Sequence, residues 1–529
     1  MNMQLISRTV RTGSVPLILA GLLSLATLAS ATTNKPAPPP PPAKPAAAAP
    51  AAKPAPAAQA PRPAGNPGGG SMQRPATGSP SVYRPSTSSP SVNRPTTSTP
   101  TYRPNGAGNP PATPNVPMGN PSPKVGPGGH IQPPVAKGTV DRKTASGSTM
   151  RMRPNGKPSD IHNAKTGMDI HHGLNGTNRV SVEDRNHNRT VFQKGRPGYV
   201  QHPFSFRQHE FAQRSYFYHG HAYNHLYYGY AYRGAFLDVY APGFYYGPAF
   251  YGWAYNPWAS PISYGWGFAG NPWSSYYGYY FAPSSSYPSA SYWLTDYMIS
   301  SDLQTAYDAH KDAGEVDGIA PAQSGPPILT PEVKQQIADE VNNDLALENQ
   351  EAQKNTQNLE VDPGSSGIDR LLDDAAHGRQ HVFVVGNPLD VVDTAQAECT
   401  LSDGDVLSLR AAPPPDSATV DLVVLTSKGA PECQMTLTVS VQLTDLQEMQ
   451  NHMRETIDQG LKELQAKQGK GGLPVEPSTA KAAPVPAQYA ALAPPPDPNA
   501  ATEIQQQALQ ANQSEQDVTA EASQPGGAQ

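Results

Sequence analysis

Apolar residues recur with a helical period in four segments of the chain. In residues 333–345 they occupy every fourth position, which predicts an amphipathic helix over 330–353. That helix would begin at a Thr-Pro-Glu sequence, a typical helix start. Similar spacing predicts helices over 292–310 and, more briefly, over 368–376, where a glycine at position 378 ends the pattern.

The longest apolar stripe lies between residues 444 and 469. Thr444-Asp-Leu-Gln447 has the spacing of a capping box, which predicts that the helix begins here. About 23 residues follow before Gly469. A single stripe of this kind is more often core than a partner site. The stripe consists of Leu446, Met449, Met453, Ile457, Leu461 and Leu464.

A period of two replaces the helical period between residues 381 and 443. Apolar or alternating runs are separated by turn sequences such as Ser402-Asp403-Gly404. The runs occupy 382–385, 405–410, 419–425 and 435–443. We expect about five short strands that form a small barrel or sandwich, with the predicted helices on its flanks.

Short extended runs with few β-branched residues fill positions 151–200. Asn155-Gly156 and Asn175-Gly176 suit tight hairpin turns between them. The pattern predicts a small antiparallel meander that would be marginally stable by itself.

Aromatic residues dominate the next segment. Residues 204–297 hold 20 Tyr, 9 Phe and all 5 Trp, while aliphatic residues are scarce. Glycine and proline interrupt the segment every few positions, so long regular elements are not expected. Tyr-Gly-Trp occurs at positions 251–253 and again at 264–266, and Asn-Pro-Trp occurs at 256–258 and 271–273.

Two interpretations of these rings stay open. The rings can pack on one another and on the meander, or they can form an exposed surface that stacks on sugars or contacts a membrane interface. On the second interpretation, the candidate binding residues are Tyr251, Trp253, Trp258, Tyr264, Trp266 and Trp273.

The segment Tyr264-Gly-Trp-Gly-Phe268 resembles the Tyr-x-Trp-Gly-x-Trp repeat of uncharacterised bacterial exported proteins. Phe268 stands where that repeat has its last Trp. The runs over 250–258 and 288–297 are also similar to such proteins, and the resemblance covers about a hundred residues. It implies a bacterial envelope setting and carries no known activity.

The front of the chain has the pattern of an export signal. Arg8 and Arg11 precede an apolar run over 15–28, and Ala29-Ser30-Ala31 follows as a small-x-small cleavage site. The run is shorter than the roughly 20 residues that span a bilayer, and no later run reaches that length, so no transmembrane helix is expected. In an oxidising compartment the two cysteines, Cys399 and Cys433, are expected to form a disulfide.

Composition and charge divide the chain into a basic front and an acidic rear. The 60 Pro and 46 Gly lower the share of residues that can build a core. Residues 1–140 carry twelve Lys or Arg and no Asp or Glu, whereas residues 300–529 carry a net charge of −23. Arg-Pro repeats about ten residues apart, at 74–75, 84–85, 94–95 and 103–104, suit either a cationic tether for an anionic surface polymer or an inert spacer.

Catalytic signatures are missing from the sequence. We find no Gly-x-Ser-x-Gly, His-Glu-x-x-His or phosphate-binding glycine motif. Nine of the 14 His lie between residues 162 and 225, which leaves open weak metal handling or an envelope enzyme.

The expectation is a binding or scaffolding protein of the bacterial periplasm or cell surface, with no catalysis and no cofactor. Its expected partner is a cell-wall or outer-membrane glycan or another envelope protein, with peripheral membrane contact possible. Export argues against a nucleic acid, and two Asn-x-Thr sequons leave a plant wall protein as a minor alternative.

The expected fold class is therefore mostly disordered plus α+β. The expected organisation is a signal peptide (1–31), a disordered cationic tether (32–150), a β-rich aromatic and Gly-rich region (151–297), a helical connector (298–365), a small β domain with flanking helices (366–468) and a disordered acidic tail (469–529).

Overall fold

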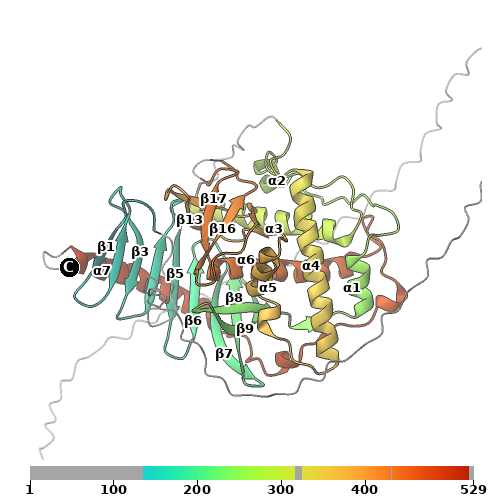
Figure 1. The fold of residues 1–529 in the computed structure, drawn as a ribbon, viewed down its shortest axis with the longest axis horizontal. Helices are drawn as coiled ribbons and strands as arrows, with labels where there is room; N and C mark the ends of the chain where they lie inside the picture. Colours follow the sequence, from blue (N-terminus) through green and yellow to red (C-terminus); the bar gives the residue numbers. More distant parts are fainter. Residues whose placement is uncertain (1–134, 316–324, 430–431, 524–529) are drawn as a thin grey trace, which may run out of the picture. The chain divides into compact units, whose positions relative to one another are not determined.

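A computed structural model describes residues 135–315, 325–429 and 432–523, which belong to one compact unit. The expected signal peptide and the Arg-Pro repeats lie outside these residues. The architecture is α+β, as predicted, with two large antiparallel sheets and seven α-helices in the described residues (Figure 1). Within the same residues, no helix is both long and apolar enough to cross a membrane.

Ten strands form a meander in which every strand pairs with its neighbours in chain order. The strands are β1 (Val140–Lys143), β2 (Thr149–Met152), β3 (Pro158–Asn163), β4 (Met168–His172), β5 (Asn178–Glu183), β6 (Arg189–Gln193), β7 (Gly198–Phe206), β8 (His209–Tyr218), β9 (His221–Tyr232) and β10 (Ala235–Ala241). Strands β1 and β2 start within the segment expected to be a disordered tether, so that boundary is wrong. The β8–β9 hairpin turns at His219-Gly220, where both residues have positive φ, as a two-residue turn of this type requires.

The helix α7 (Ala500–Ala522) contacts strands β2 to β8 of the meander (Figure 1). Its Ala511 and Val518 pack on Ile161, Met168 and Ile170, which face one side of the sheet. The prediction of a disordered tail over 469–529 is therefore wrong for these residues. The helix has few apolar positions, and they bury their side chains only because the sheet supplies a matching apolar face.

The aromatic segment forms mostly helices and irregular structure after the meander ends. It contains β11 (Phe244–Tyr245), α1 (Pro248–Tyr255), α2 (Pro272–Tyr276) and the start of α3 (Ala290–Ala313). The two-residue strand β11 pairs with β18 (Val485–Pro486). The expectation of a β-rich region up to residue 297 is thus right for its first part and wrong for its second.

The four predicted helices are present. They are α3, α4 (Pro331–Thr356), α5 (Ile368–Ala376) and α6 (Leu443–Lys467), accompanied by short 3-10 turns at Pro363–Ser365, Ser478–Ala480 and Gln488–Ala491. Thr330 caps α4 as expected, because its side chain accepts a hydrogen bond from the Val333 N–H. The capping box predicted for α6 is wrong: the helix starts one residue earlier, after Gln442, and Gln447 accepts a hydrogen bond from the backbone of Ile368.

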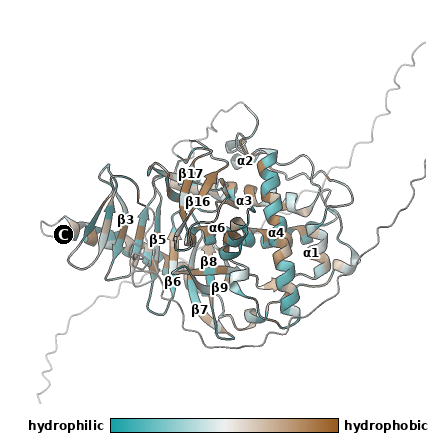
Figure 2. Ribbon diagram, in the orientation of Figure 1, coloured by the Kyte–Doolittle hydropathy of each residue, from teal (hydrophilic) through white to brown (hydrophobic). Residues whose placement is uncertain are grey.

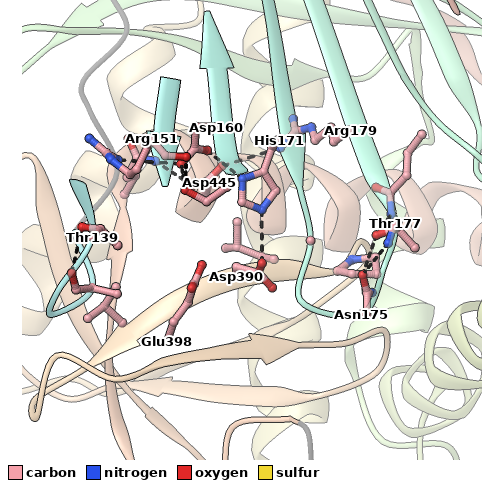
Figure 3. Close-up of a pocket in the computed structure, with 18 residues that line it drawn as sticks. Thr139, Arg151, Asp160, His171, Asn175, Thr177, Arg179, Asp390, Glu398 and Asp445 are labelled. Carbon is pink, nitrogen blue, oxygen red and sulfur yellow. Dashed lines mark hydrogen bonds and ion pairs between the residues drawn. The ribbon is translucent and has the colours of Figure 1, made fainter. Parts of the chain in front are cut away.

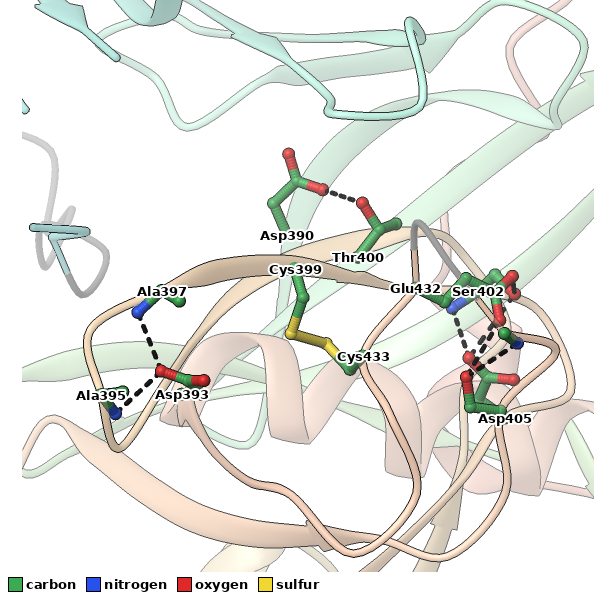
Figure 4. The surroundings of a disulfide bond; sticks show 12 residues. Asp390, Asp393, Ala395, Ala397, Cys399, Thr400, Ser402, Asp405, Glu432 and Cys433 are labelled. Carbon is green, nitrogen blue, oxygen red and sulfur yellow. Dashed lines mark hydrogen bonds between the residues drawn. A yellow bond between two sulfur atoms is a disulfide. The ribbon is translucent and has the colours of Figure 1, made fainter. Parts of the chain in front are cut away.

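A second sheet has six strands in the order β12-β15-β16-β17-β13-β14. The strands are β12 (His381–Val384), β13 (Leu389–Asp393), β14 (Glu398–Leu401), β15 (Val406–Leu409), β16 (Thr419–Val424) and β17 (Thr438–Gln442). The edge strands β12 and β14 do not pair with each other, so the sheet is open and the expectation of a barrel is wrong. The predicted disulfide is present: Cys399 in β14 bonds to Cys433 in the segment that precedes β17 (Figure 4).

One hydrophobic core joins segments that we expected to form separate domains. It runs from the last meander strands through the aromatic segment, α3, α4 and α6 to the six-stranded sheet. Figure 2 shows α4 with alternating hydrophobic and hydrophilic residues, and β16 and β17 as mainly hydrophobic strands. The meander thus rests on this core with its last strands and on α7 with its first strands.

Candidate functional site: a groove beside the meander

The six aromatic residues expected to bind a ligand pack on the main core. Tyr251, Trp258 and Trp273 are buried, with at most 9% of the residue exposed. For these three rings the first of the two interpretations, packing in the core, is the one observed, since scarce aliphatic residues leave the rings to fill the core themselves. Trp253, Tyr264 and Trp266 are half-buried. Trp266 stacks on the fully buried Trp293, and its indole N–H donates to the Tyr287 hydroxyl at 2.6 Å.

The His-rich segment does not assemble a metal centre. Among the described residues there is no group of three or more His, Cys, Asp or Glu side chains that could hold a metal ion. Its histidines are instead spread along the meander, where several pair with carboxylates, as His162 does with Asp169 at 2.7 Å.

One face of the meander carries a ladder of charged residues. The pairing register places Asp141, Arg151, Asp160, His171 and Arg179 opposite one another on β1 to β5. From Asp141 to His171 each facing pair joins opposite charges, which favours this register, whereas His171 and Arg179 at the last step are both basic. The ladder lies on the side of the sheet away from α7 and faces β13, β14 and the start of α6 (Figure 3).

A groove runs between this face and the elements opposite. It consists of two adjoining cavities of about 180 and 210 Å³. The first lies between β2–β6 and β13–β14, and the second lies between β5–β9 and the elements α3 and α6. Five residues line both cavities: Arg179, Gln193, Pro388, Leu389 and Asp445. The two cavities are therefore continuous and form one groove along the meander.

Asp390 lies in the wall of the first cavity and contacts residues of both sheets. It accepts hydrogen bonds from Thr400 at 2.6 Å and from the Leu174 N–H at 2.8 Å. Arg153 contacts it at 3.0 Å and also makes two bonds of 2.7 Å to Glu398. Arg153 directly follows strand β2 of the meander, whereas Asp390 and Glu398 lie in strands of the six-stranded sheet. These ion pairs therefore join the two sheets.

His171 bridges the two sheets at the same point. Its Nδ1 lies 2.8 Å from Asp160 and its Nε2 lies 3.3 Å from Asp390 (Figure 3). Burial lowers the pKa of His171, but the hydrogen bonds and charges of these two carboxylates outweigh it and raise that pKa to about 9. The ring is therefore a cation at neutral pH, which explains why it sits between two anions.

The second cavity has a polar stripe of α6 as one wall. Asp445, Glu448, His452, Glu455 and Gln459 recur at spacings of three and four residues and line the cavity. They occupy one face of the helix, while the apolar stripe predicted from the sequence occupies another. The same helix therefore supplies both core and groove.

His452 forms a buried pair with Asp302 of α3. Its Nε2 lies 2.8 Å from Oδ1 of Asp302, and burial lowers its pKa less than this carboxylate raises it, to about 9. A Cβ at Gly386 would lie 2.2 Å from the imidazole Cδ2, so only glycine lets the ring lie against this backbone. The other oxygen of Asp302 has no hydrogen-bond partner in the described part of the chain, although the residue is buried. Such an atom calls for a water or ligand partner.

Three tyrosines face the α6 stripe from neighbouring strands. Tyr199, Tyr216 and Tyr223 are directly opposite one another on β7, β8 and β9. The rings of Tyr216 and Tyr223 are parallel to within 2°, with centroids 5.0 Å apart. Tyr223 is 37% exposed, so the pair presents a stacking surface at the groove.

Sequence reasoning missed this groove. Its walls come from residues more than 200 positions apart, and only strand register brings Tyr216 beside Tyr223. One signal was available: the acids and histidine of α6 repeat at helical spacing on the side opposite the apolar stripe.

Comparison of the chain with protein-family models, with curated proteins and with solved structures finds no match.

Proposed function

We propose that this protein is an exported, non-enzymatic binding protein of a bacterial cell envelope, and that it holds a glycan strand in the groove between the meander and α6. The observation that carries the proposal is the stacked pair Tyr216 and Tyr223 at the edge of this groove. A half-exposed phenol ring offers an apolar face to a sugar ring and a hydroxyl to its edge.

The rest of the groove has the chemistry that a polyhydroxyl ligand needs. Its donors include Arg179 and Gln193, and its acceptors include Asp445 and Glu398. Because the walls offer both donors and acceptors, the groove suits a ligand whose hydroxyls both donate and accept.

Export is supported by two features. The Cys399–Cys433 disulfide is the kind of bond that oxidising compartments retain. The front of the sequence has the three parts of a secretory signal. The basic segment before the described residues adds attraction for anionic surface polymers, which salt weakens.

The test is retention of the full-length protein on purified peptidoglycan and on outer-membrane material, at low and high salt. We expect Tyr223→Ala to weaken the salt-resistant part of the binding about three- to tenfold, since one aromatic stacking contact is lost. Tyr255→Ala is the matched control, because Tyr255 is an exposed tyrosine at the end of α1, outside the groove.

Other outcomes have definite meanings. If Trp253→Ala weakens retention and Tyr223→Ala does not, the site lies on the aromatic segment and the groove assignment is wrong. If the wild-type protein is not retained on either material at either salt concentration, the glycan-binding function is wrong.

A further inference from the structure

Two carboxylates that lie two turns apart on α6 differ in whether they form an ion pair. Glu448 accepts two hydrogen bonds from Arg214, at 2.8 and 2.7 Å. Glu455 lies seven residues later on the same helix face and accepts one bond of 2.5 Å, from the hydroxyl of Tyr227. Among the described residues, Glu455 forms no ion pair. Its negative charge therefore remains available in the groove, which it lines.

The rings beside Glu455 form a partial aromatic box. Tyr216 and Tyr223 stack on each other, and the ring of His225 is nearly perpendicular to both, with its centroid 5.6 and 5.5 Å from theirs. The Tyr216 hydroxyl is 2.8 Å from the Tyr227 hydroxyl, which in turn bonds to Glu455. Aromatic faces next to a carboxylate attract a cation by two additive interactions.

Arg214 shows the same chemistry carried out inside the protein. Its guanidinium lies 3.9 Å from the ring of Tyr227 and 4.6 Å from that of Tyr199, and it pairs with Glu448. In the described part of the chain, no Lys or Arg lies over the ring of Tyr216 or Tyr223. The chain thus supplies an arginine to the first tyrosine and carboxylate group. Beside the second, Glu455 helps to raise the pKa of His452, but that ring pairs with Asp302 and forms no ion pair with Glu455 in the described residues.

We infer that the groove binds a glycan that carries a free, protonated amino group, which Glu455 and the half-exposed ring of Tyr223 receive. The inference rests on the proposed function and adds the class of sugar. The sugar ring stacks on the exposed Tyr223, and its ammonium group lies toward Glu455. A sugar whose amine is acetylated keeps the stacking contact and loses the charge.

The experiment compares two probes by titration calorimetry with the full-length protein. The probes are short glucosamine oligomers with free amines and the same oligomers fully N-acetylated. The wild-type protein should bind the free-amine oligomer about tenfold more tightly, the size of a desolvated cation–π and ion-pair contact. Glu455→Gln should reduce the ratio of the two affinities to about one.

The control is Glu463→Gln, on the same helix but outside the groove. Glu463 pairs with Lys467 at 2.9 Å, and its substitution should leave the tenfold preference intact. The side chain of the Glu455→Gln variant can still accept the hydrogen bond from Tyr227, so the fold should persist. Tyr223→Ala is a second variant, and it should weaken the binding of both oligomers.

Equal affinity of the wild-type protein for both oligomers, or a preference that survives Glu455→Gln, would overturn the inference. If neither oligomer binds and the protein is still retained on envelope material, the amine class is wrong while the proposed function stands. Loss of retention on that material as well would overturn both.

Discussion

The two sheets of this protein are stabilised in different ways. In the six-stranded sheet, β12 and β15 are buried on both faces and most buried side chains are aliphatic. The meander buries aliphatic residues under α7 in its first strands and in the main core in its last strands, and its face toward the groove carries charges and tyrosines. The pattern of hydrophobic residues is enough to predict a sheet that is buried on both faces. The meander depends on specific pairs, and its polar face is the one left open to a groove.

The largest loss in the free energy of unfolding is expected from the substitution of a buried arginine in the meander. Arg214 is 0% exposed and contacts Glu448, Asp238 and Gln201. Arg214→Ala would leave two carboxylates without their cation, and breaking a buried pair in this way costs about 3–5 kcal/mol. Urea unfolding of the full-length protein, followed by circular dichroism, measures this loss.

Arg233→Ala is the control for that prediction. Arg233 lies in the β9–β10 turn and donates to the carbonyl of Pro414, so its loss should cost less than about 1 kcal/mol. Equal effects of the two substitutions would contradict the view that the meander depends on its buried arginine.

The six-stranded sheet should respond most to its disulfide. The bond closes a loop with a sequence separation of 34 residues, which in the chain-entropy model contributes about 3–4 kcal/mol. The double variant Cys399→Ser with Cys433→Ser should lower the free energy of unfolding by that amount. Adding a reductant should destabilise the wild-type protein and leave the double variant unchanged. A reductant effect on the double variant would show that the loss has another origin.

The smallest effect is expected from pH at the contact between the sheets. The pKa of His171 is raised from 6.5 to about 9, so its stabilising contribution is complete below pH 6.5 and is lost as pH rises through 9. Its side chain is 36% exposed, so solvent screens the pair and the effect should be below about 1 kcal/mol. His171→Gln should flatten the loss of unfolding free energy between pH 6.5 and 10.

The same contact has an acid limit. Burial raises the pKa of Asp390, but hydrogen bonds from His171 and Thr400 lower it by more, so that the pKa falls below its ordinary value of 3.8. The contribution of Asp390 is therefore present above that value and is lost as the solution becomes more acidic. An alkaline loss that is identical in the wild-type protein and in His171→Gln would contradict the assignment of this titration to His171.

Periodicity predicted the helices because each has an apolar stripe that needs no knowledge of its partner. The same reasoning missed α7, where Ala511 and Val518 are sparse among polar residues and gain their burial from the sheet. It also left a barrel or a sandwich open for the second sheet, because closure depends on whether β12 and β14 meet, and strand patterns do not contain that information.

The site was harder to predict than the fold. The sequence drew attention to the tryptophans, which fill a core poor in aliphatic residues. The tyrosines that line the groove, Tyr216 and Tyr223, look no different in the sequence from their neighbours. Their position depends on register across a hairpin and on a helix more than 200 residues away.

The position of α7 also has a consequence for the order of events during synthesis. Ser146, in the turn between β1 and β2, contacts Glu521 of α7, 375 residues later. The strands leave the ribosome well before the helix that covers Met168 and Ile170. Until that helix is made, this apolar face is open to chaperones and to other chains, and the long separation slows its closure. A chain cut short before α7 would therefore expose an apolar sheet face that α7 otherwise covers.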